Sequence, residues 1–71
     1  MKLPPLLAVV ALLVDVPEHG LTRGEMGTVV EYLGSGKAVL VEFSDDEGET
    51  YAAVDLLPDQ MIELHGRLQA A

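Results

Sequence analysis

The stretch Gly24-Glu25-Met26-Gly27-Thr28-Val29-Val30-Glu31-Tyr32-Leu33 decides the fold that this sequence predicts. Two glycines three residues apart lead into a β-branched run. A glycine tolerates a positive φ and lets another backbone approach closely, so the pair favours a sharp turn directly before a strand. Thr28, Val29 and Val30 favour the extended state because their stiff side chains suit a pleated surface. We therefore expect a strand over 26–33.

The rest of the chain predicts four further short strands joined by tight turns. Apolar and β-branched runs place them at 9–14, 38–43, 50–54 and 61–64, with a short helical lead over 6–8 before the first. Pro58 precludes a central strand, so the segment 55–60 is expected to form a single helical turn. This order predicts an all-β fold, a small five-stranded SH3-like barrel with a short helical turn before the last strand, whose closure would remove exposed edges.

The turns carry their own conformational predictions. Gly34-Ser35-Gly36-Lys37 suits a hairpin with a positive φ, and Gly48 is the expected positive-φ residue of the acidic turn 44–49. Leu21 is expected to pin the long first loop to the core, and Phe43 to pack in it, with both tyrosines half exposed. The 71 residues predict one domain, with an N-terminal arm at 1–5 and a C-terminal tail at 66–71, in which Leu68 would begin a frayed helix.

The chain is short and apolar, which favours self-association. It has no cysteine, a hydrophobic fraction of 49% and a mean hydropathy of +0.30. A domain of this size buries only about 60% of its unfolded surface and usually needs disulfides, a metal or a partner subunit. The alternative is that alanine and valine raise the apolar count and a monomer is sufficient. We expect a homo-oligomer whose contact residues are Leu6, Leu7, Val10, Leu12 and Val14.

The run from Leu6 to Val14 contains no polar residue, and it has three interpretations. It is too short to span a membrane, which takes about 20 apolar residues. A signal peptide would need a small-residue cleavage site, but Asp15-Val16-Pro17-Glu18 follows instead. The remaining interpretation is a strand that is apolar on both faces and is therefore covered on both. It predicts a cytoplasmic protein with a subunit contact.

The charge balance excludes several kinds of partner. Twelve Asp and Glu against four Lys and Arg give a formal charge of −8. Nucleic acids and anionic membranes are bound mainly through basic side chains, so neither is an expected partner. The charge either only keeps an apolar chain soluble or attracts a basic protein. The residues expected to face such a partner are Asp15, Glu18, His19, Asp45, Asp46 and Glu47.

No set of residues in the sequence predicts catalysis. His19 and His65 are the only histidines, and neither has the spacing of a metal-binding pair or lies beside a nucleophile. The acidic turn 45–49 is too short for a calcium-binding loop of the EF-hand type. We therefore expect no enzyme activity, no cofactor and no metal. The alternative is a small-ligand or metal-binding domain in which His19, His65 and the acidic turn converge.

The pattern of glycines, prolines and β-branched residues resembles that of a family of very short bacterial proteins, domain of unknown function 4926. The resemblance covers roughly residues 6–64 and is carried by Val9-Val10-Ala11-Leu12, Pro17-Glu18-His19-Gly20-Leu21, Arg23-Gly24, Gly27-Thr28-Val29-Val30-Glu31, Val41-Glu42-Phe43, Asp46, Gly48 and Thr50-Tyr51-Ala52. It implies the barrel fold, but no established activity and no catalytic residues. The sequence thus predicts a non-enzymatic protein-interaction module that self-associates. This hypothesis extends to an accessory or antitoxin-like role beside a larger enzyme.

Overall fold

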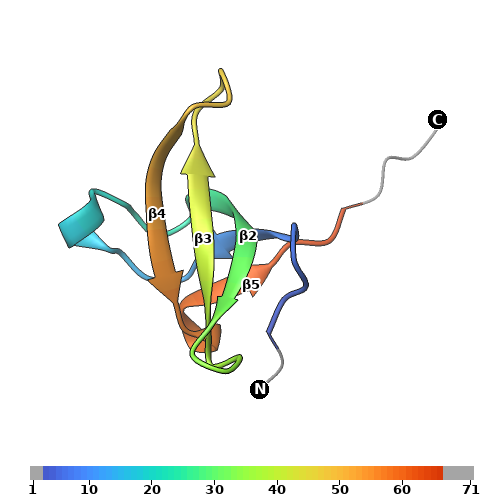
Figure 1. Ribbon diagram of the computed structural model, residues 1–71. Coiled ribbons are helices and arrows are strands. Elements are labelled where there is room, and N and C mark those ends of the chain that lie inside the picture. Colours follow the sequence, from blue (N-terminus) through green and yellow to red (C-terminus); the bar gives the residue numbers. More distant parts are fainter. Residues whose placement is uncertain (1–2, 67–71) are drawn as a thin grey trace.

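The computed structural model describes residues 3–66 and is an all-β fold, as predicted (Figure 1). Five strands and two single 3-10 turns follow one another along the chain. They are β1 (Val9–Leu12), η1 (Pro17–His19), β2 (Met26–Leu33), β3 (Ala38–Ser44), β4 (Thr50–Leu56), η2 (Pro58–Gln60) and β5 (Met61–Glu63). The predicted strand 26–33 is confirmed, and the helical turn before the last strand is confirmed over 58–60, whereas Asp55 and Leu56, predicted to begin that turn, form the end of β4. The helix predicted to begin at Leu68 lies outside the described residues.

Two predicted segments differ from the structure near the start of the chain. The first strand ends at Leu12 instead of Val14, because the backbone bends at Leu13 and Val14. The expected helical lead over 6–8 is a turn, closed by a hydrogen bond from the Ala8 N–H to the Pro5 carbonyl and with Leu7 at a φ of 69°. Pro4, in the predicted arm, is buried, and its carbonyl accepts a hydrogen bond from the Tyr32 hydroxyl.

All five strands form one antiparallel sheet in the order β4-β3-β2-β1-β5. The register places Ala11 opposite Met26 on one side and Ile62 on the other, and it shifts at a bulge near Val30 in β2. The expectation that hydrogen bonds close the barrel and remove its edges is wrong. Among residues 3–66, strand β5, only three residues long, pairs with β1 alone and β4 pairs with β3 alone, so both are edge strands.

The core lies on the concave side of this curled sheet. Alternate residues of each strand point inward, because successive side chains of a strand face opposite sides. Phe43 is fully buried, as predicted, and Leu21 anchors the long first loop in the same cluster. The hydrophobic residues of the described chain that form this cluster are Val10, Leu12, Val16, Leu21, Val29, Val39, Val41, Phe43, Val54, Leu56 and Met61.

The placement of Val10 and Leu12 corrects the set of predicted contact residues. Their side chains are 0% and 2% exposed, within the core of their own chain. They therefore cannot touch a second copy of the folded domain. The sequence run is apolar on both faces, and the tertiary structure decides that the even-numbered residues, 10 and 12, are the ones that point inward.

The two glycines before β2 have different roles. Gly24 adopts a φ of 96° and donates its N–H to the Leu12 carbonyl, which turns the chain into the strand. Gly27 is buried against β3, where an added Cβ would lie 2.6 Å from Val41 Cγ1 and 2.8 Å from the Glu42 carbonyl oxygen. The predicted sharp turn and the predicted close approach are therefore both present, one at each glycine.

Candidate interaction surfaces

A contiguous apolar surface covers the outer side of β1 and its two neighbours, and we call it the β1 outer face. Because Ala11 pairs directly with Met26 and with Ile62, these three side chains lie in one row across the sheet. Leu64 continues beside Val9, to whose carbonyl its N–H donates. The members of the β1 outer face are Val9, Ala11, Leu13, Met26, Ile62 and Leu64.

The β1 outer face is large for so small a domain. Met26 is 60% exposed and Ile62 50%, and Val9, Leu13 and Leu64 are each at least 40% exposed. Together the five large side chains expose on the order of 400 Å², a size at which an apolar patch usually marks a contact site. None of the members is charged, in a chain with a formal charge of −8.

Three of the residues predicted to mediate self-association are exposed at the two ends of β1. Leu6 and Leu7 precede the strand and Val14 follows it, and Leu7, at 75%, has the highest exposure of these. They flank the β1 outer face along the chain. The members of that face outside β1 cannot be predicted from the sequence, because only strand pairing brings Met26, Ile62 and Leu64 beside Val9 and Ala11.

The acidic residues of the first loop lie along one groove. Asp15, Glu18 and His19 line a depression of about 390 Å³ together with Asp55 of β4 and Gln60 of η2. The loop is held by paired backbone hydrogen bonds between Val16 and Leu21, and Asp15 Oδ1 accepts from the Arg23 N–H at 2.8 Å. Nothing in the sequence pattern singles out Asp55, and it joins these residues because of the sheet topology.

The acidic turn between β3 and β4 divides into structural and free carboxylates. Asp45 Oδ1 accepts hydrogen bonds from the N–H groups of Glu47 and Glu49, at 2.9 and 3.0 Å, which closes the turn. Gly48 takes the positive φ of 82° that the sequence predicts. Asp46 and the Glu47 side chain are exposed and project from the turn. Asp45, one of the three residues of this turn that were predicted to face a partner, thus has a structural role within the turn.

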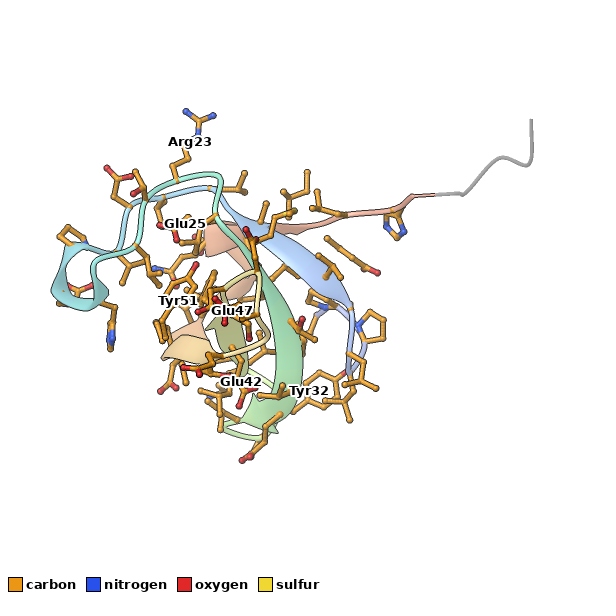
Figure 2. The ribbon with its side chains drawn as sticks, turned by 90° about the horizontal axis from the view of Figure 1, so that it is seen from above. Arg23, Glu25, Tyr32, Glu42, Glu47 and Tyr51 are labelled. Atoms are coloured by element: carbon orange, nitrogen blue, oxygen red, sulfur yellow. The ribbon has the colours of Figure 1, made fainter. Side chains whose placement is uncertain are left out.

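A hydrogen bond joins β4 to the residue that precedes β2. The Tyr51 hydroxyl donates to Glu25 Oε1 at 2.8 Å, and Figure 2 shows Arg23 pointing away from them. The pKa of Glu25 lies below its ordinary value of 4.5, first because the Thr22 backbone N–H donates to it and second because Tyr51 does. The pKa of Tyr51 lies above its ordinary value of 10.0, mainly because its proton is shared with Glu25.

This pair predicts how the alkaline titration of Tyr51 responds to mutation. In a Tyr32→Phe background, where Tyr51 is the one tyrosine left, we expect Glu25→Ala to move the absorbance titration of the phenol down toward 10.0. Glu47→Ala is the control and should leave the titration in place, since Glu47 makes no hydrogen bond to the phenol among the described residues. An unchanged titration in the Glu25 variant would contradict the bond.

The same pair contributes to stability over a defined range of pH. Since the folded pKa of Glu25 is lowered, its contribution is present above 4.5 and is lost as the pH falls through the lowered value. Since the folded pKa of Tyr51 is raised, its contribution is present below 10.0 and is lost as the pH rises through the raised value. The pair therefore stabilises the fold across neutral pH.

The arrangement of the histidines is inconsistent with the alternative of a converging metal site. Figure 1 shows η1, which holds His19, at the opposite side of the sheet from the chain that leaves β5 toward His65, with the β3–β4 turn at a third position. His65 instead lies 3.9 Å from Glu63. Within residues 3–66, no group of three or more His, Asp or Glu side chains is placed to hold a metal ion. The prediction of convergence is wrong, because the sheet separates the three segments.

A comparison with protein families identifies the chain. The family model described as Domain of unknown function (DUF4926) matches residues 6–63. The chain belongs to this family. The matched segment of this DUF4926 domain runs from the turn before β1 to the end of β5, so it contains all five strands. No curated protein and no solved structure matches it significantly. Within the described part of this DUF4926 domain, no helix is long and apolar enough to cross a membrane.

Proposed function

We propose that this DUF4926 domain is a non-enzymatic protein-interaction module that associates with further copies of itself through the β1 outer face. The observation that carries the proposal is the gathering of five large, exposed apolar side chains on one side of three paired strands. Burying such a face between copies stabilises an assembly because about 25 cal/mol is gained for each Å² of apolar surface removed from water.

Charge supports the same choice of face. A chain with a formal charge of −8 repels its own copies wherever carboxylates meet. The β1 outer face contains no charged side chain, so two copies related by a twofold axis can pair there without placing the carboxylates of one copy of this face against those of the other. Leu6, Leu7 and Val14, at the ends of β1, extend the apolar contact along the chain.

The proposal includes a cytoplasmic location and an accessory role beside a larger protein. The apolar run that could serve as a signal peptide contains β1, whose Val10 and Leu12 belong to the core, so cleavage of that run would destroy the fold. A domain with so small a core and so large an exposed apolar face is suited to binding rather than to catalysis.

Self-association is tested by light scattering after size-exclusion chromatography. We expect the unmodified domain to show a mass above that of one chain, and Met26→Glu combined with Ile62→Glu to reduce it to a monomer while preserving the β-sheet circular dichroism. Each introduced carboxylate would be desolvated in the contact, which costs several kcal/mol. The control is Leu57→Glu, because Leu57 is 52% exposed but lies beside η2, outside the β1 outer face.

The two variants distinguish association through the β1 outer face from association driven by the total exposed apolar area. A monomeric mass for the unmodified domain at high concentration would refute the proposal. A monomer produced equally by Leu57→Glu would show that the total exposed apolar area, and not the β1 outer face, drives association.

A further inference from the structure

Strand β4 presents a free backbone edge that the proposed function does not use. It is seven residues long and, in the part of the chain that the structure describes, pairs only with β3. Within residues 3–66, the backbone hydrogen bonds outside the β3 ladder involve no residue of Thr50–Leu56. Every second N–H and C=O of β4 therefore points away from the sheet. Such a row is a template for pairing with another extended chain.

The free edge opens into the groove already described. Figure 1 shows η1 lying beyond β4, on the side away from β3. The groove between them is lined by Asp15, Glu18 and His19 from the loop, and by Ala53 and Asp55 from β4, with further lining residues between these. Its volume of about 390 Å³ lies within the range of ligand sites. A chain laid in this groove would run alongside the unpaired backbone groups.

The lining of the groove specifies the side chains of its occupant. Asp15, Glu18 and Asp55 place three carboxylates around it, whereas the buried Val16 and Leu56 give it an apolar base. Since side chains of an extended chain alternate between two sides, one set would rest on the apolar base and the other would face the carboxylates. The complementary chain alternates apolar and basic residues.

We propose that the β4 edge binds an extended basic segment of a partner protein, which adds a strand to the sheet. A second copy of this chain is the wrong occupant, because it would bring the same carboxylates against each other across the edge. The backbone groups of β4 provide affinity, and Asp15, Glu18 and Asp55 select for lysine and arginine. The inference does not depend on self-association, which uses a different surface.

The test uses a synthetic peptide of about eight residues that alternates valine and lysine, the length being that of an added strand. We expect it to shift the amide resonances of β4 and to slow their hydrogen exchange in the full chain. Two peptides serve as controls. One carries N-methyl groups on alternate amides, which keeps the charge but removes the backbone donors, and the other replaces lysine with glutamate. Both should bind at least tenfold more weakly.

Charge reversal in the protein locates the site. Glu18→Lys combined with Asp55→Lys should weaken binding of the lysine peptide about tenfold or more, whereas the matched pair Asp46→Lys with Glu47→Lys should not reach that effect, although it changes the net charge equally. Equal binding of the N-methylated peptide, resonance shifts confined to the acidic turn or to the β1 outer face, or no binding at all would overturn the proposal. Protection of β4 that grows with protein concentration alone would assign the edge to a second copy and overturn it as well.

Discussion

Replacing Gly27 with alanine is expected to destabilise the domain by about 2–3 kcal/mol, which would lower the melting temperature by roughly 10–20 °C. The added Cβ would lie 2.6 Å from Val41 Cγ1, 2.8 Å from the Glu42 carbonyl oxygen and 3.0 Å from Phe43 Cε2. Val41 and Phe43 are both fully buried, so neither side chain can move away without disturbing the core. The close approach of β2 to β3 depends on the missing side chain.

The measurement is thermal unfolding followed by circular dichroism. Gly66→Ala is the matched control, because a Cβ at Gly66 meets no atom within 4 Å and the residue has no positive φ. That variant should melt with the unmodified domain. Equal melting temperatures for the Gly27 and Gly66 variants would mean that β2 and β3 do not approach as closely as the structure has them.

Two neighbouring substitutions in β1 are expected to have opposite consequences. Val10→Asp should leave the chain unfolded at neutral pH, because it places a carboxylate at a position that is fully buried and costs about 5 kcal/mol or more. A domain of this length has a total stability of only about 4–10 kcal/mol. Val9→Asp should fold, because Val9 is 45% exposed, with a penalty of about 1 kcal/mol for aspartate in a strand.

The pair also separates folding from assembly. Both variants have the same composition and charge, so any difference between them comes from the face on which the residue lies. Val9→Asp places its charge on the β1 outer face and should yield a folded monomer in light scattering. Two folded variants, or two unfolded ones, would show that the inward and outward residues of β1 have been assigned incorrectly.

Much of the fold was predictable because local chemistry determines it. The β-branched run Thr28-Val29-Val30 and the two preceding glycines gave the bounds of β2, and Pro58 gave the 3-10 turn before β5. The positive φ of Gly48 follows from the turn it occupies. These features depend on residues close in sequence, where sterics leave few conformations.

The candidate surfaces were predicted only in part. The run Leu6–Val14 is apolar on both faces, but apolarity alone does not decide which of the two alternating sets of side chains points inward. Similarly, the sequence predicts that Asp15 and Glu18 face a partner, but it does not indicate that Asp55 lies across the groove from them. A register is set by pairing between distant segments, and a shift by one residue exchanges the two faces of a strand.

The sequence by itself therefore determined the all-β class, the order of the elements and the turns, since each rests on short-range steric preferences. The tertiary structure alone decided that Val10 and Leu12 fill the core while Val9 meets solvent, and that the sheet stays open at β4 and β5. The physical reason is that both outcomes depend on which strands pair and in what register. The pairing and the register are those that bury the most apolar surface, and that burial depends on residues from the whole chain.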